Sequence, residues 1–298
     1  MISPWRKLRY RATRTWLRDP ILWLRHRGLD SSDAFLAEFP RSGSTWLRFM
    51  LLEILTRTSA GFLNVNSAIP EIGTHGSAQP ILPGGRRLIK THERYRRNYK
   101  RVIYLVRDVR DVLFSMQACD QEFGWADYFS CGRDFDGYLE SFLKGETVRF
   151  GSWQGHVDSF LDSGAAKCGD LLLIHYEEMR RNTEAILWKI LEFLEVEAEP
   201  SVVQSAITNN TLERMRAKED SVKRPDVKLT KGTLLRGHKK GRFVGKGALG
   251  GWREKLTPVQ LQLIDQYAGD AMQRLGYQLG STVLDAEDEE ASLRVQNR

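Results

Sequence analysis

Residues 39–46 have the composition of an anion-binding turn. They read Phe-Pro-Arg-Ser-Gly-Ser-Thr-Trp and separate an apolar run from an amphipathic stretch. Gly43 allows the backbone to approach an anion closely, and Arg41 supplies a full positive charge. The hydroxyls of Ser42, Ser44 and Thr45 are further donors. A helix that starts directly after the turn would point free N–H groups and the positive end of its dipole at the same place. These residues predict a phosphate cradle, although such a turn is also typical of a simple helix N-cap.

The turn differs from the Walker A loop of nucleotide kinases. The pattern G-x-x-x-x-G-K-[ST] is absent, so the lysine that such kinases place on the phosphates is missing. A P-loop nucleotide kinase remains an alternative because it would use the same strand–loop–helix cradle. Trp46, which ends the turn, is compatible with a core position or with a platform for a nucleotide base.

Short apolar runs alternate with helical patterns from residue 34 onward. We expect strands at residues 34–39, 88–89, 101–106 and 171–174, and helices at residues 45–57, 108–116 and 184–194. This alternation predicts an α/β fold, a single domain with a P-loop-like central, mostly parallel sheet flanked by helices. Ligands of such sheets bind beyond the carboxyl ends of the strands. The turns at residues 40–46, 90–92 and 107–115 all leave strands at that edge, so we expect them to meet.

The positive charge of the chain is concentrated in residues 1–28. The formal net charge is +7, and this segment holds eight Lys or Arg side chains against one Asp, 8 − 1 = +7, which is the whole excess. Trp5, Leu8, Ala12 and Trp16 recur at helical spacing, and Asp19-Pro20 is expected to interrupt the helix. Such a basic amphipathic segment suits peripheral contact with an anionic membrane. The alternative is a solvated helix whose apolar stripe docks on its own domain.

The remainder has the composition of an ordinary globular domain. Hydrophobic residues make up 41% of the 298 residues and charged residues 28%. We place this domain at residues 29–284 and expect residues 285–298 to form a flexible C-terminal tail. Residues 29–298 are formally neutral, which argues against an extensive nucleic-acid interface. Neither a membrane span nor a signal peptide is recognisable, so we expect a cytoplasmic protein that contacts the membrane, if at all, through residues 1–28.

Three more blocks follow the turn in order. They are Ile89-Lys-Thr-His92, the run from Val102 to Ser115, and Gly247-Ala-Leu-Gly-Gly-Trp252-Arg. With residues 39–46, they resemble the donor-binding signature Y-P-K-S-G-T-T-W, the K-T-H block, the 3′-phosphate block and the G-x-x-G-x-W segment of PAPS-dependent sulfotransferases of the cytosolic type. The resemblance runs from about residue 33 to 277. It implies transfer of a sulfuryl group from the nucleotide PAPS to a hydroxyl acceptor, with PAP as the product.

The resemblance also assigns donor contacts. Arg107, at a strand end, and Ser115, two turns into the next helix, would hold the 3′-phosphate between a forked cation and a hydroxyl. Trp46 would lie against adenine and Tyr176 against the donor, and Thr211, Lys246 and Gly247 match further positions of the donor site. Considered without the other blocks, Arg107 would be read as a surface arginine paired with Asp108 or Asp111.

His92 matches the general base of this family. A neutral imidazole would take the proton of the acceptor hydroxyl as its oxygen attacks sulfur. Lys90 and Arg41 would stabilise the charge that develops on the bridging and leaving phosphate oxygens. The scheme requires no metal, and the three cysteines show no metal-ligand spacing. The acceptor class is open: a small alcohol or phenol, a sugar or a lipid-linked glycan. The alternative outside enzymology is a non-catalytic basic protein that docks on membranes.

The sequence departs from the family pattern at three donor positions. Arg41 replaces the usual loop lysine, which keeps the charge but changes its shape. Gly245-Lys246-Gly247 replaces Arg-Lys-Gly, which puts one 3′-phosphate contact in doubt and leaves Arg242 as a substitute. Asn210-Thr211-Leu212 stands where Thr-Ser-Phe is common, so an aromatic face against adenine is expected to be lost.

Overall fold

The computed structural model describes residues 18–123, 134–223, 242–245, 247 and 249–282. Its centre is a four-stranded sheet in the order β2-β1-β3-β4, in which every pairing is parallel. The strands are β1 (Ala34–Glu38), β2 (Leu88–Thr91), β3 (Val102–Val106) and β4 (Leu171–His175). The predicted α/β fold with a parallel, helix-flanked sheet is therefore confirmed.

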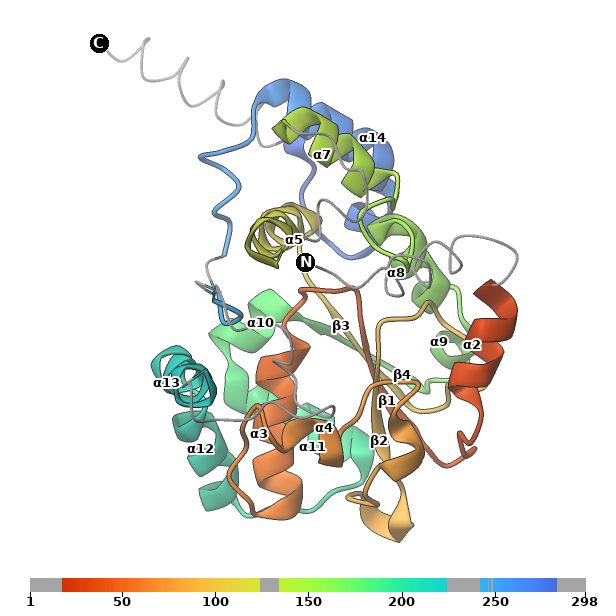
Figure 1. The fold of residues 1–298 in the computed structure, drawn as a ribbon. Coiled ribbons are helices and arrows are strands. Elements are labelled where there is room, and N and C mark those ends of the chain that lie inside the picture. Colours follow the sequence, from red (N-terminus) through yellow and green to blue (C-terminus); the bar gives the residue numbers. More distant parts are fainter. Residues whose placement is uncertain (1–17, 124–133, 224–241, 246, 248, 283–298) are drawn as a thin grey trace.

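Helices cover both faces of the sheet (Figure 1). One face carries α5 (Val109–Phe123), α7 (Phe135–Leu143), α8 (Trp153–Leu161) and α14 (Pro258–Arg274). The other carries α3 (Ser44–Thr56), α11 (Thr183–Leu194), α12 (Pro200–Asn209) and α13 (Leu212–Val222). Shorter helices are α4 (Val65–Ala68), α9 (Gly164–Lys167) and α10 (Tyr176–Arg181), with 3₁₀ turns at His75–Ser77 and Pro83–Gly85.

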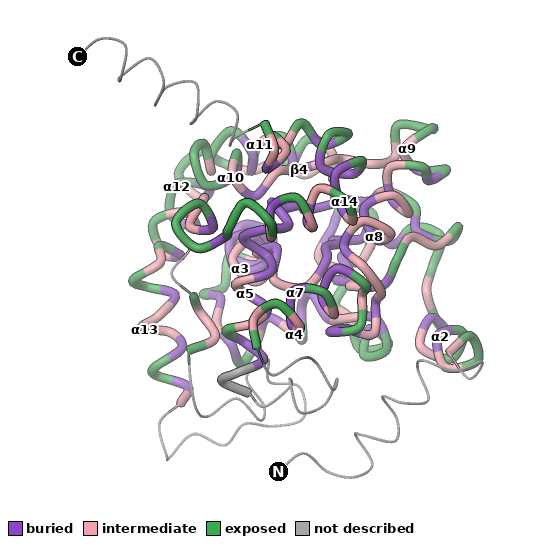
Figure 2. Tube along the Cα trace, turned by 90° about the horizontal axis from the view of Figure 1, so that it is seen from above, coloured by how far each residue is buried: buried purple, intermediate pink, exposed green. Residues whose placement is uncertain are grey.

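The central strands are buried on both faces and supply two cores. Phe35 and Ala37 of β1 pack into the core beneath α5, α8 and α14, whereas Ala34 and Leu36 pack into the core beneath α3 and α11. This alternation follows from the two-residue period of a strand. Strands buried in this way are typical of parallel sheets, and they hold the ends of β1, β2 and β3 rigidly. Figure 2 shows α3 and α5 among buried residues and α2 and α9 at the rim.

The described part of the basic leader is a helix, α2 (Arg18–His26), that packs on the domain. Leu22 is buried, and His26 Nδ1 donates to its carbonyl at 2.6 Å while Nε2 accepts from the Tyr99 hydroxyl at 2.6 Å. Pro20 itself lies within α2. The helix that Asp19-Pro20 is expected to interrupt, over residues 5–16, lies outside the described residues. The helix expected at residues 108–116 extends further, to Phe123.

Two buried histidines predict loss of stability in acid. Burial lowers the pKa of His26 to about 4 and that of His156 to about 3, from an ordinary 6.5. Between pH 6.5 and these values the unfolded chain binds more protons than the folded one, so the free energy of unfolding falls as pH falls. Urea denaturation at about pH 7.5 and about pH 5 measures this, and equal unfolding free energies at the two pH values would contradict it.

Candidate functional site

The turn between β1 and α3 has a backbone that only a glycine tolerates at its fifth residue. Gly43 has φ 109°, and a Cβ built there would lie 2.6 Å from the Tyr176 ring. Arg41 also has a positive φ of 72°. The Gly43 N-cap offers α3 no side-chain acceptor, and the Ser42 hydroxyl is fully buried without a hydrogen-bond partner. A buried unpaired donor next to a helix start fits an anion, as the sequence predicts.

Ser44 and Thr45 differ in their surroundings. Thr45 is half-buried, whereas Ser44 is buried and its two donors already have an acceptor. The backbone N–H of Ser44 donates to the Glu38 carboxylate at 2.7 Å, and its hydroxyl donates to the other oxygen of the same carboxylate. Ser44 therefore does not offer a free hydroxyl to the cradle.

Arg41 connects the turn to two distant segments. Its Nε donates to the Ser115 hydroxyl at 3.1 Å, and its Nη2 donates to the Phe243 carbonyl at 3.3 Å. The guanidinium also lies 5.2 Å from the centre of the Phe243 ring. The structure thus brings Arg41 and Ser115 together, although the family resemblance assigns them to different phosphates.

Arg107 lies where β3 ends, between an aromatic ring and a carboxylate. Its guanidinium carbon is 4.5 Å from the centre of the Tyr176 ring, and its Nη2 is 3.7 Å from Asp111. The predicted alternative partner, Asp108, instead forms a bidentate pair with Arg110. Because Tyr176 also touches Gly43, one ring joins Arg107 to the anion-binding turn.

The predicted base-binding residues surround the same tyrosine. Trp46 meets Tyr176 edge to face with centroids 6.4 Å apart, and its Nε1 donates to the Asn210 carbonyl at 2.8 Å. A Cβ on Gly247 would lie 3.8 Å from the Tyr176 hydroxyl. Thr211 has a structural task, since its hydroxyl caps α13 by accepting from the Arg214 N–H.

Two further predictions concern the C-terminal segment. Lys246 lies outside the described residues. Arg242, considered as a substitute for the missing 3′-phosphate contact, forms an exposed ion pair with Asp220 at 2.8 Å. Arg180, which the sequence analysis missed, lies over the Trp46 ring with its guanidinium 5.2 Å from the ring centre. Its place one turn into α10 is set by the start of the helix at Tyr176.

His92 and Lys90 form a contact pair at the end of β2. His92 Nδ1 lies 3.2 Å from the Glu38 carbonyl, which can only accept, so Nδ1 carries the proton. Nε2 therefore carries the lone pair, which accepts a hydrogen bond from Lys90 Nζ. Burial and the charge of Lys90 hold the pKa of His92 well below 6.5, while burial also lowers the pKa of Lys90. A neutral imidazole with its lone pair on Nε2 is the form that general-base chemistry requires, once Lys90 gives up this contact.

His156 supports His92 from α8. It is fully buried, its Nε2 donates to the His92 carbonyl at 3.1 Å, and its Nδ1 accepts from the Tyr104 hydroxyl at 2.9 Å. Glu38, His156, Arg180 and Phe243 are the residues of this region that sequence reasoning missed. Glu38 carried one signal, an acidic side chain ending an apolar run directly before the turn.

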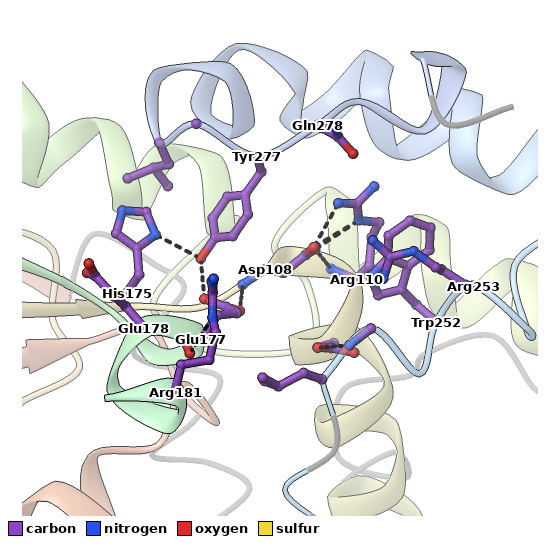
Figure 3. Close-up of a pocket in the computed structure, with 15 residues that line it drawn as sticks. Asp108, Arg110, His175, Glu177, Glu178, Arg181, Trp252, Arg253, Tyr277 and Gln278 are labelled. Carbon is purple, nitrogen blue, oxygen red and sulfur yellow. Dashed lines mark hydrogen bonds and ion pairs between the residues drawn. The ribbon is translucent and has the colours of Figure 1, made fainter. Parts of the chain in front are cut away.

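A cavity of about 530 Å³ adjoins the start of α5 and is lined by residues that include Asp108, Glu177 and Trp252 (Figure 3). At its wall the Glu177 carboxylate accepts from the Asp108 N–H at 3.0 Å and from the Tyr277 hydroxyl at 2.9 Å. Arg110 lies 3.7 Å above the centre of the Trp252 ring. These contacts stabilise the turn between β3 and α5. Because Trp252 belongs to the G-x-x-G-x-W block, they also link that block to the turn.

Neither a metal cluster nor a membrane span is found in the described parts of the chain. No three His, Cys, Asp or Glu side chains gather there in a way that could hold a metal ion. No described helix is both long and apolar enough to cross a bilayer.

A family model for the sulfotransferase domain matches residues 31–276. The chain belongs to the sulfotransferase family. Dog (Canis lupus familiaris) sulfotransferase 1B1 is 27% identical over 251 residues, covering 78% of this chain and 81% of that protein. Human sulfotransferase 2A1 is 26% identical over 269 residues, covering 83% and 86%. The enzyme class predicted from the four blocks is thus confirmed.

Solved structures agree with this sulfotransferase assignment. Mouse sulfotransferase SULT7A1 complexed with PAP matches with a TM-score of 0.60 at 25% identity, covering 84% of this chain and 87% of that one. A retinol dehydratase complex matches with a TM-score of 0.62 at 16% identity, which bears on the fold alone.

Replacing Gly43 tests the fit between the turn and Tyr176. Gly43→Ala should lower the free energy of unfolding by about 1–3 kcal/mol, because the side chain strains φ and collides with the ring. Gly28→Ala is the matched control, since Gly28 has φ 88° and open space around its Cβ position. Urea denaturation of both variants separates the cost of the strained φ, which both share, from the cost of the collision with Tyr176, which only Gly43→Ala has. A Gly43→Ala cost no larger than that of Gly28→Ala would show that contact with Tyr176 is not the constraint.

Proposed function

We propose that this sulfotransferase uses PAPS as its donor and transfers the sulfuryl group to a hydroxyl acceptor with His92 as the base. The observation that supports the proposal is that the residue 39–46 turn, the buried Arg107 and a neutral His92 each follow the end of a strand at one edge of the parallel sheet. The solved mouse relative that contains PAP supports the choice of nucleotide.

The donor contacts follow from this arrangement. The Ser42 hydroxyl and the backbone of Gly43 would face the 5′-phosphosulfate, with Arg41 as the nearby cation. Arg107 and Ser115 would hold the 3′-phosphate, which requires Arg41 to share or release the Ser115 hydroxyl. Trp46, Tyr176 and Gly247 would border the nucleoside, and Arg180 would move from the Trp46 face or stack beyond the base.

The transfer step uses the His92–Lys90 pair. His92 Nε2 would accept the proton of the acceptor hydroxyl while the hydroxyl oxygen bonds to sulfur. The bond between sulfur and the bridging phosphate oxygen breaks, and its electron pair leaves on that oxygen with PAP. Lys90, released from Nε2 by the incoming hydroxyl, would stabilise the charge on the bridging oxygen.

Charged side chains beside this pair favour a polar acceptor. The Glu71 carboxylate lies 3.5 Å from Arg149 and 3.8 Å from Arg25, and its side chain is 39% exposed. Burial opposes its ionisation, but the positive charges around it, above all that of Lys90, outweigh burial and lower its pKa to about 2. A fixed carboxylate accepts hydrogen bonds from hydroxyl groups, so a sugar or polyol fits better than an unsubstituted phenol.

Replacing His92 tests the catalytic assignment. His92→Ala should lower turnover by about 10²–10⁴-fold, because proton transfer is lost, while PAP affinity stays within about threefold of the wild type. Transfer is measured with radiolabelled PAPS on the acceptor selected from phenols, sugars and lipid-linked glycans, and PAP binding by calorimetry. Transfer at the wild-type rate in the variant would remove His92 from the mechanism.

We further propose that the leader makes peripheral contact with an anionic membrane. On α2, Trp23 is 67% exposed and Leu24 is 62% exposed, so apolar side chains face outward beside a strongly basic segment. Such a location suits an acceptor carried by a lipid.

Deleting residues 1–17 removes five basic side chains and keeps α2 on the domain. The deletion should weaken binding to vesicles containing phosphatidylserine by at least about tenfold, since each basic residue near the surface contributes about 1 kcal/mol. Sedimentation with vesicles measures this, and phosphatidylcholine vesicles are the control. Unchanged binding to the anionic vesicles would contradict the proposal.

A further inference from the structure

Glu38 is a buried carboxylate at the start of the phosphate-binding turn. It ends β1, is 3% exposed, and accepts both the N–H and the hydroxyl of Ser44. It therefore occupies the N-terminus of α3, the place where a helix attracts an anion. The turn thus contains an internal anion next to the position of the donor's anionic 5′ group.

An internal anion has two opposite effects on a phosphate site. It fixes the start of the helix by satisfying donors that would otherwise lack partners. It also repels a second anion a few ångströms away, and this repulsion is strong where water is excluded. A carboxylate at this position is expected to weaken donor and product binding while keeping the turn ordered.

The same carboxylate faces the transfer machinery. Its Oε1 lies 3.7 Å from Lys90 Nζ and 3.7 Å from His92 Nδ1, and its own carbonyl accepts from His92 Nδ1. The Lys90 side chain is only 7% exposed. A buried ammonium group needs a counterion to remain charged, and burial alone lowers its pKa.

We propose that Glu38 is a positioning residue with two effects. It keeps Lys90 charged and fixed in position, and its negative charge limits the affinity for PAP, so that PAP dissociates after transfer. The proposal rests on the proposed function, because it presumes that PAP binds at the β1–α3 turn. This role differs from a purely structural one in the direction in which removing the Glu38 charge changes PAP affinity. Loss of a structural contact weakens ligand binding, whereas loss of an internal anion strengthens it.

Glu38→Gln keeps the shape of the side chain and removes its charge. Calorimetry should show PAP bound about tenfold more tightly than by the wild type, because a nearby negative charge is gone. With PAPS and acceptor, kcat should fall about tenfold while the KM for PAPS also falls, because Lys90 loses its counterion and PAP leaves more slowly. Weaker PAP binding, or unchanged PAP binding and kcat, would overturn the proposal.

Glu53→Gln is the matched control. Glu53 is a buried carboxylate near the other end of α3, about 13 Å along the helix axis from Ser44, and it pairs with Lys218 at 3.1 Å. This substitution also leaves a lysine without its counterion, but it should leave PAP affinity within about twofold of the wild type. An equal tightening in Glu53→Gln would show that the effect of Glu38 is not local, which would also overturn the proposal.

Glu38→Asp covers the case in which the glutamine variant fails to fold. Aspartate keeps the charge but is one methylene shorter, so PAP affinity should stay within about threefold of the wild type while kcat falls as Lys90 shifts. Tenfold weaker PAP binding would show that Glu38 supports the ligand, and the proposal would be wrong. Wild-type protein that binds no PAP would instead refute the donor assignment, so the two failures are distinguishable.

Discussion

The parallel pairing of β1 with β2 on one side and β3 on the other is the constraint on which the site depends. The register places Leu36 opposite Lys90 and Glu38 opposite Leu105. The residue 39–46 turn, His92 and Arg107 each follow one of the three strands, so they leave the sheet at one edge. Because these strands are buried on both faces, a shift of register would move the chemistry and disrupt both cores together.

Burial is the second determinant of the site's chemistry. Lys90, Glu38 and His92 are close together with little exposure. The charge of Lys90 helps to lower the pKa of His92, and the Glu38 carboxylate partly offsets the effect of burial on the pKa of Lys90. Burial keeps His92 neutral. The Glu38 carbonyl accepts a hydrogen bond from Nδ1 of His92, so the proton of the neutral imidazole is on Nδ1. In water the lysine would interact with the imidazole only weakly. The fold thus holds a neutral imidazole in contact with a buried lysine.

The periodicity and turn residues were sufficient to predict the sheet, its parallel character and the edge at which the three turns leave it. Four ordered blocks were sufficient for the enzyme class. Contacts between distant segments were not predictable. Examples are the hydrogen bond from Arg41 to Ser115, the two hydrogen bonds from Ser44 to Glu38, and the hydrogen bond from His156 in α8 to the His92 carbonyl. They depend on side-chain geometry across elements that lie far apart in the chain.

The central claim is that the nucleotide site is built for a 3′-phosphate. Calorimetric titration of the wild-type protein with PAP and, separately, with ADP tests it most directly, because ADP has no group to place between Arg107 and Ser115. Two charge-assisted contacts predict that PAP binds about a hundredfold more tightly than ADP. ADP binding as tight as PAP binding would contradict the account and favour the nucleotide-kinase alternative.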